Sequence, residues 1–176
     1  MEHTLETGRL RLRPCRAEDA VGLREFWADE RVRRFLFDGR EVSDDEARAF
    51  VARSLDAFAR HRLGLWLAFE KEETERALEE TQRAVAFAGF LMNDGEPPSL
   101  VYGVRPEAWG RGLATEAARA VLDYALGVLR LPRVRADVDA PNAASVRVLE
   151  KLGMTRAARA EVEGRPLLYF EKSREA

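Results

Sequence analysis

Two closely spaced glycines, Gly110 and Gly112, precede a long amphipathic segment and are well suited to bind an anion through backbone amides. Glycine has no Cβ, so the backbone can come close to a ligand. The first N–H groups of a helix have no carbonyl partner within that helix, and they attract negative charge. Residues 109–115 are therefore predicted to form a cradle of main-chain donors for a phosphate or a diphosphate.

The same two glycines also suit an ordinary tight turn, and the short pattern alone leaves both interpretations open. The pattern is not a nucleotide P-loop, because no Gly-Lys-Ser or Gly-Lys-Thr follows it. It also differs from the fingerprint of dinucleotide-binding oxidoreductases, whose glycines open a βαβ unit near the start of the chain. An oxidoreductase is therefore the least favoured alternative.

The segments around the glycines are predicted to form a strand, a helix and a second strand. Residues 100–104 suit a strand that Pro106 ends, and residues 134–138 suit another. The helix between them is predicted at residues 112–129. Its apolar stripe is expected to comprise Ala114, Ala118, Val121, Ala125 and Val128. Such a unit implies parallel strands with a right-handed crossover, and the glycine turn then lies at the carboxyl end of a central strand, where open α/β sheets bind ligands.

The rest of the chain alternates between strand and helix patterns. Further strands are predicted at residues 9–13, 64–69, 84–92, 154–163 and 166–172. Further helices are predicted at residues 17–30, after the capping box of Ser43 and Glu46, and after Ser145. Residues 31–38 are ambiguous, with a bulky patch that suits either the core or the mouth of a substrate pocket. Residues 71–83 are strongly charged and are predicted to form a solvated excursion between two strands.

Composition limits the classes of function. A chain of 176 residues with 46% apolar and 34% charged residues suits one globular domain over residues 1–176. The net charge of −2 disfavours nucleic acid and an anionic membrane as partners, and no apolar run is long enough to span a bilayer. The single Cys15 excludes an internal disulfide and, with no secretion signal visible, favours the cytoplasm. We expect no metal site, because the acidic turn after Ser43 is better explained by the helix dipole.

Taken together, the motifs resemble the GNAT superfamily of acyl-CoA-dependent N-acetyltransferases over nearly the whole chain. The resemblance rests on residues 10–14, residues 102–104, the Trp-Gly-Arg-Gly-Leu-Ala-Thr-Glu-Ala run of residues 109–117, and residues 142–154. The form of the glycine run and the pair Asn142 and Ser145 are similar to the Rim-type branch, which acetylates ribosomal-protein N termini. Each motif alone is weak, and their combination in this order is what carries the resemblance.

The resemblance implies an α/β fold with a mixed, mostly antiparallel sheet of seven twisted strands flanked by about four helices. Two central parallel strands, residues 100–104 and 134–138, would splay apart to admit acetyl-CoA. The pantetheine would pair with the backbone of Tyr102 and Val104, and Asn142 would bond the same arm. The diphosphate would lie on the backbone of Trp109, Gly110, Arg111, Gly112, Leu113, Ala114 and Thr115. For the Arg111 side chain, both a contact with phosphate and simple solvation stay open.

The implied reaction is attack of a primary amine on the acetyl carbonyl. Ser145 is the position at which Rim-type enzymes hold a hydroxyl near the thioester sulfur, although Asn142 and Ser145 also suit plain helix caps. The Rim-type pattern puts the general base at Glu161, with Glu163, a water molecule or a merely solvent-facing carboxylate as alternatives.

The acceptor implied by the Rim-type branch is a protein N-terminal α-amine, such as that of a ribosomal protein. A small amine, namely a polyamine, an amino acid or an antibiotic, stays open as the acceptor. So does a CoA-binding regulatory module that has lost turnover. A homodimer is expected only by analogy.

Overall fold

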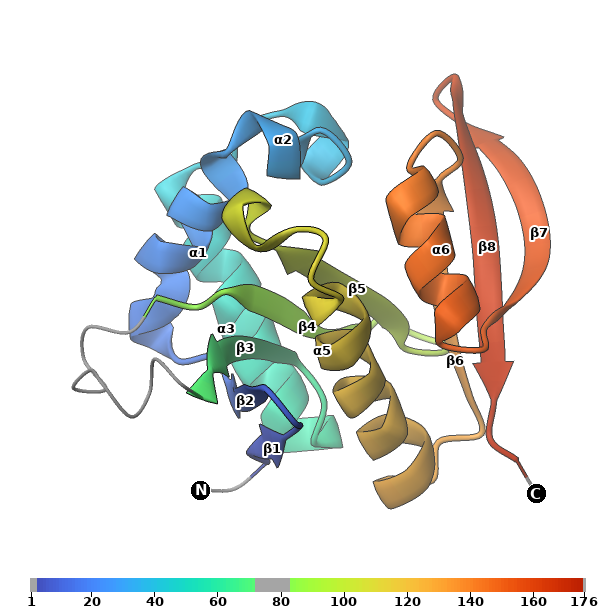
Figure 1. Ribbon diagram of the computed structural model, residues 1–176, viewed down its shortest axis with the longest axis horizontal. Helices are drawn as coiled ribbons and strands as arrows, with labels where there is room; N and C mark the ends of the chain where they lie inside the picture. The colour runs from blue at the N-terminus through green and yellow to red at the C-terminus, as the bar shows by residue number, and fades with distance from the viewer. Residues whose placement is uncertain (1–2, 72–82, 176) are drawn as a thin grey trace.

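The computed structural model describes residues 3–71 and 83–175, in which eight strands form one sheet (Figure 1). In spatial order the strands are β1 (Leu5–Glu6), β2 (Leu10–Pro14), β3 (Leu65–Glu70), β4 (Ala86–Leu91), β5 (Ser99–Val104), β6 (Arg133–Asp139), β8 (Arg165–Ser173) and β7 (Thr155–Val162). All neighbours are antiparallel except β5 and β6. The mixed, mostly antiparallel sheet is confirmed, and the extra strand is the two-residue β1, which is too short to leave an alternating pattern in the sequence.

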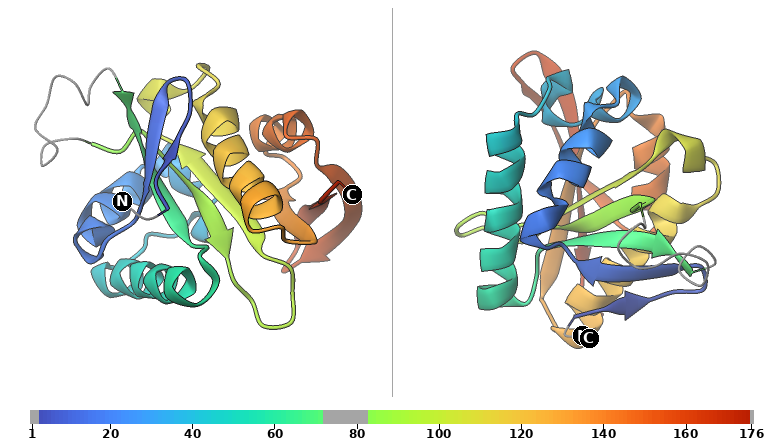
Figure 2. Two further views of the ribbon diagram at one scale, coloured as in Figure 1. Left: turned by 90° about the horizontal axis from the view of Figure 1, so that it is seen from below. Right: turned by 90° about the vertical axis from the view of Figure 1, so that its left-hand side faces the viewer.

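Helices cover both faces of this sheet. Among the described residues they are α1 (Ala20–Ala28), α2 (Glu30–Arg33), α3 (Asp44–His61), α5 (Leu113–Asp123) and α6 (Ala143–Lys151). Figure 2 shows α1 and α3 on one face and α5 and α6 on the other. One buried cluster lies largely between the sheet and α5 and α6, and a second is built around Phe26, Trp27 and Phe87 under α1.

The start of α3 follows from a predicted capping box. The Ser43 hydroxyl accepts a hydrogen bond from Glu46 N at 3.2 Å, and the Glu46 carboxylate accepts one from Ser43 N at 2.9 Å. These bonds satisfy amides that the helix itself leaves unpaired.

The ambiguous segment after α1 forms α2 and a 3-10 turn, η2 (Phe37–Gly39), whose Phe37 ring packs with its centroid 5.0 Å from that of Trp27. The predicted excursion at residues 71–83 falls mostly outside the described residues.

The helix after the glycine turn differs from its prediction in its second half. It is α-helical to Asp123 and continues as a π-helical turn, η5 (Tyr124–Val128). The wider turn rotates later side chains off the stripe of an α-helix. Val128 is therefore 63% exposed, so its predicted place on the buried stripe is wrong, whereas Ala118, Val121 and Ala125 are buried as predicted.

The two parallel strands separate soon after they meet. β5 and β6 pair at one position, Ser99 with Arg135, and Arg135 N donates to Pro98 O at 3.0 Å. Toward their carboxyl ends the ladder stops, which confirms the predicted splay. The opening between these strands leads to the glycine turn after β5 and to the start of α6 after β6 (Figure 1). In the part of the chain that the structure describes, no helix is both long and apolar enough to cross a membrane.

Candidate active site

The glycine turn joins β5 to α5 through a short 3-10 segment, η4 (Pro106–Ala108). Gly110 and Gly112 both have φ +75°, a left-handed conformation in which other residues are strained. The structure describes no side chain that caps α5 at Gly112, so amides of the first helical turn stay available to a ligand. Residues 109–115, where a cradle of main-chain donors is predicted, thus contain two left-handed glycines and a helix start without a side-chain cap.

Beyond Ser99, the edge of β5 that faces the opening has no partner strand among the described residues. Arg105 N donates to Val85 O at 2.9 Å, which fixes the alternation of the antiparallel ladder between β5 and β4. By this alternation the backbone groups of Tyr102 and Val104 point away from β4, toward β6. The Val104 carbonyl accepts a hydrogen bond of 2.8 Å from the Trp109 indole. The N–H groups of Tyr102 and Val104 thus line the opening at the place predicted for a pantetheine arm.

Tyr102 and Ser145 meet across this opening. The phenolic oxygen of Tyr102 lies 2.6 Å from Ser145 Oγ and 3.1 Å from the Ser145 carbonyl oxygen. Burial raises the pKa of Tyr102 to about 12, against a smaller lowering from the bond to Ser145. The phenol therefore stays protonated at neutral pH and can donate to either oxygen.

Asn142 is the N-cap of α6. Its side-chain oxygen accepts a hydrogen bond of 3.2 Å from Ser145 N. This contact is that of a helix cap, which is one of the two roles predicted for Asn142. The side-chain nitrogen of Asn142 is a different group, and it can donate a hydrogen bond. Tyr102, Asn142 and Ser145 are thus brought together from β5 and from the start of α6.

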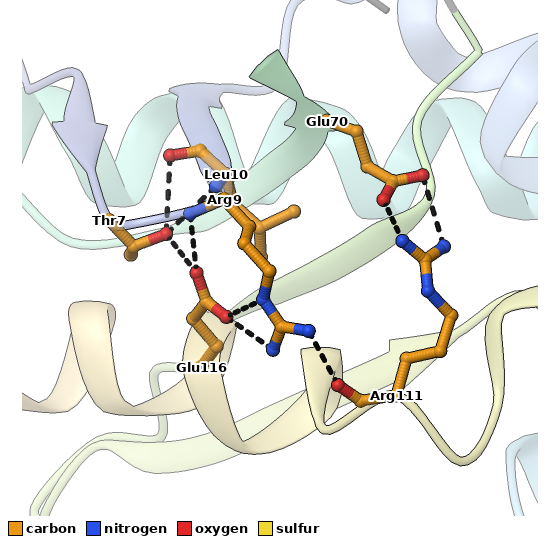
Figure 3. Close-up of polar contacts among 6 residues, drawn as sticks. All are labelled: Thr7, Arg9, Leu10, Glu70, Arg111 and Glu116. Carbon is orange, nitrogen blue, oxygen red and sulfur yellow. Dashed lines mark hydrogen bonds and ion pairs between the residues drawn. The ribbon is translucent and has the colours of Figure 1, made fainter. Parts of the chain in front are cut away.

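The Arg111 side chain forms an ion pair with Glu70 at the end of β3 (Figure 3). The two Arg111 nitrogens face the two carboxylate oxygens, with Nη1 at 3.2 Å from Oε2. In this arrangement Arg111 contributes its backbone to the glycine turn, while its charge lies against β3.

The carboxylates predicted as the general base lie on the late hairpin. Glu161 is exposed on β7, opposite Pro166 of β8 in the ladder, and Glu163 lies in the turn with φ +51°. β8 separates β7 from β6 in the sheet.

Asp139 is a carboxylate that the sequence analysis did not single out. It is the last residue of β6, its side chain is 13% exposed, and its Oδ1 has no hydrogen-bond partner among the described residues. Burial raises the pKa of Asp139, and Asp38 and Asp137 add to this rise, whereas Arg165, whose Nη1 lies 3.8 Å from Oδ1, opposes it. A carboxylate with a raised pKa at the carboxyl end of a central strand is a candidate general base. The sequence does contain a signal for Asp139, because this residue directly follows the strand predicted at residues 134–138, and open α/β sheets bind ligands at the carboxyl ends of such strands.

Metal ligands do not converge in the described parts of the chain: no group of three or more His, Cys, Asp or Glu side chains there could hold a metal ion. The only titratable thiol, Cys15, is buried, and its sulfur lies 3.2 Å from the Ser54 hydroxyl.

A splayed parallel pair with a glycine turn at its carboxyl end defines the class of protein. The family model described as "Acetyltransferase (GNAT) domain" matches residues 9–155, so the chain belongs to the GNAT acetyltransferase family.

Among curated proteins the chain is 28% identical over 155 residues to the uncharacterized N-acetyltransferase p20 of Bacillus licheniformis, covering 87% of this chain and 83% of that protein. Among solved structures, a GNAT-family acetyltransferase from Bacillus anthracis matches with a TM-score of 0.78 at 22% identity, over 98% of this chain and 99% of the other. RimL, a ribosomal L7/L12 alpha-N-protein acetyltransferase in complex with coenzyme A, also matches with a TM-score of 0.78, at 14% identity over 97% and 98% of the two chains. At these identities the two structures establish a shared fold.

Proposed function

We propose that this protein transfers the acetyl group of acetyl-CoA to a primary amine, and that the preferred acceptor is a protein N-terminal α-amine. The observation that carries the proposal is the open edge of β5, which has no partner strand beyond Ser99 in the described parts of the chain and leads directly into the glycine turn. This edge fits a chain of amides such as pantetheine, and the turn fits a diphosphate. Tyr102 and Val104 would hold the pantetheine, the amides of residues 109–115 the diphosphate, and the Asn142 amide nitrogen the same arm.

Positioning supplies much of the rate in such a reaction, because the thioester is already activated and the amine has only to be held against its carbonyl. The N–H of Val104 faces the opening and is a donor for the oxyanion that forms on attack. The thiolate that leaves needs a proton. The Ser145 hydroxyl, which Tyr102 contacts at 2.6 Å, is the group assigned to give or share it.

A base must leave the acceptor amine neutral. An α-amine with a pKa near ~8 is about one-tenth neutral at pH 7, whereas a lysine with a pKa near ~10.4 is less than about a thousandth neutral. An α-amine therefore demands less of the base. Glu161 remains our first assignment, with Glu163 or water as alternatives, and the raised pKa of Asp139 makes it a further candidate.

The acceptor assignment draws on the Rim-type motif around Trp109 and Ser145 and on the likeness to RimL, a ribosomal L7/L12 alpha-N-protein acetyltransferase. A small amine is the alternative acceptor within the same reaction.

We also propose a cytoplasmic location, in keeping with the free, buried Cys15. We further propose a homodimer, which light scattering after size-exclusion chromatography tests.

The test is thiol release from acetyl-CoA with a panel of acceptors: N-terminal peptides of ribosomal proteins, the same peptides with blocked N termini, and polyamines, amino acids and aminoglycosides. We expect release with free N-terminal peptides and none with blocked ones. Release only with small amines would overturn the acceptor assignment. Tight binding of acetyl-CoA by calorimetry without release for any amine would replace the enzyme by a CoA-binding regulatory module.

A further inference from the structure

The turn between β1 and β2 is bound to the glycine turn and to the first turn of α5, which lie more than 100 positions away in sequence (Figure 3). Arg9 lies at the centre of this contact. Its Nε donates to Glu116 Oε2 at 2.7 Å, its Nη2 lies 2.6 Å from the same oxygen, and its Nη1 donates to the Arg111 carbonyl at 2.7 Å. One guanidinium thus bonds a helix side chain and a loop carbonyl at the same time.

Glu116 gathers further bonds from the same turn. Its Oε1 accepts from Thr7 Oγ1 at 2.5 Å and from Arg9 N at 2.9 Å. Burial raises the pKa of Glu116, but the bonds from Thr7 and Arg9 outweigh it, so the net pKa is lowered and the group stays ionised. Its side chain is 19% exposed, so the pair with Arg9 is partly shielded from water.

The bond to the Arg111 carbonyl sets the direction of an amide in the cradle. The peptide between Arg111 and Gly112 is trans, and in a trans peptide the C=O and the following N–H point in opposite directions. Because Arg9 holds the carbonyl, the Gly112 N–H points away from Arg9. Glycine populates other conformations readily, so this bond restricts a peptide whose following residue, Gly112 with φ +75°, is itself permissive.

The same contact affects the electrostatics of the cradle. Glu116 is the acidic residue in the first turn of α5, close to where the diphosphate would lie. An unpaired carboxylate there would repel a diphosphate. The guanidinium of Arg9 compensates that charge, which leaves the helix N-terminus attractive to an anion.

We infer that Arg9 is a positioning residue for the diphosphate of acetyl-CoA, acting through the Arg111 carbonyl and the Glu116 carboxylate. The inference rests on the proposed function, since it assigns a diphosphate to the glycine turn. The turn that carries Arg9 has other anchors, because Lys71 Nζ donates to Thr7 O at 2.6 Å and Trp66 Nε1 donates to His3 O at 2.7 Å. Loss of the Arg9 side chain therefore leaves the hairpin attached.

The test compares two acetyl donors, acetyl-CoA and S-acetylpantetheine, which carries the same thioester without the diphosphate. For Arg9→Met we expect the KM for acetyl-CoA to rise about tenfold, as for the loss of hydrogen bonds to a charged group, with kcat nearly unchanged. The kcat/KM for S-acetylpantetheine should stay at the wild-type value. Arg11→Met is the matched control, because Arg11 lies two residues further along, in β2, is similarly exposed and pairs with Glu6 instead of the glycine turn.

Arg9→Lys separates positioning from a direct charge contact. A lysine keeps the charge that offsets Glu116 but cannot bond the carbonyl and the carboxylate with one planar group, so positioning predicts a raised KM for acetyl-CoA here too, although smaller than that of Arg9→Met. A Lys variant with the wild-type KM would overturn the inference, as would an equal loss with both donors. Calorimetric titration with CoA gives the binding readout, and melting curves confirm the fold. Absence of CoA binding by the wild-type protein would instead reject the proposed function.

Discussion

The phenolic oxygen of Tyr102 lies 2.6 Å from Ser145 Oγ, so a strand and a helix 43 positions apart in sequence meet at one hydrogen bond across the opening of the sheet. The phenol has one proton to donate, and two acceptors of Ser145 lie within reach of it, Oγ and the carbonyl oxygen. When the proton goes to Oγ, the Ser145 hydroxyl hydrogen is free to point at a ligand. When it goes to the carbonyl, Oγ donates back to the phenol. Tyr102 thus controls where the Ser145 hydroxyl points.

Replacing Tyr102 by phenylalanine removes this control and keeps the ring. We expect Tyr102→Phe to lower kcat about tenfold, the effect of one charge-stabilising hydrogen bond, with little change in the KM for acetyl-CoA. Steady-state kinetics with an accepted amine measures the split. A raised KM with unchanged kcat would make Tyr102 a binding residue only.

Ser145→Ala removes the hydroxyl itself. If it helps the thiolate to leave, kcat should fall about a hundredfold, within the range for general acid catalysis, while CoA affinity stays near wild type. A double variant with Tyr102→Phe should then be no slower than Ser145→Ala alone, because the phenol acts through the serine. Undiminished turnover of Ser145→Ala would leave the residue as part of the helix start.

Gly112→Pro tests the cradle. Proline removes the amide at this position and cannot adopt the observed φ of +75°, so CoA binding should be lost. Gly95→Pro is the matched control, since Gly95 also has φ +75° but lies in the turn between β4 and β5. We expect similar strain in both variants and loss of affinity in Gly112→Pro alone, as measured by calorimetry. Equal affinities would put the diphosphate elsewhere.

Asp139→Asn and Glu161→Gln distinguish the candidate bases. The base must be ionised, so activity should fall as the pH drops through its pKa, and loss of the true base should lower kcat/KM about a hundredfold or more and remove this acidic limb. A pH profile of each variant measures both effects. If both profiles keep the wild-type acidic limb, neither carboxylate is the base, and water or Glu163 takes that role.

Asp139 should also affect stability in a defined direction. Its pKa is raised in the folded protein, so the folded state binds more protons than the unfolded chain once the pH exceeds 3.8, the ordinary pKa of an aspartate. Stability contributed by this group is therefore full below that pH and is lost as the pH rises through the folded pKa. Asp139→Asn is expected to melt at a higher temperature than wild type at pH 7 and at a similar temperature near pH 4. A lower melting temperature of Asp139→Asn at pH 7 would contradict the conclusion that burial disfavours the ionised Asp139 side chain.

Much of this fold can be predicted from the sequence because the elements concerned depend on local interactions. The capping box of Ser43 and Glu46, the two glycines before α5 and the alternation in β2 each depend on neighbours a few residues away. The strand, glycine turn and helix order then places the anion cradle at a strand end by the geometry of parallel crossovers. The π-helical turn was missed because its side chains are compatible with an ordinary helix until packing widens the backbone.

By itself the sequence determined the class of fold, the position of the glycine turn before α5 and the capping box that starts α3, because these depend on short-range conformational preferences. Only the tertiary structure decided which distant groups meet: Tyr102 with Ser145, Arg9 with Glu116 and the Arg111 carbonyl, and Arg111 with Glu70. Such pairings depend on how far each strand extends and where the sheet opens. The hydrophobic packing of the whole domain sets those quantities, and no short stretch of residues encodes them.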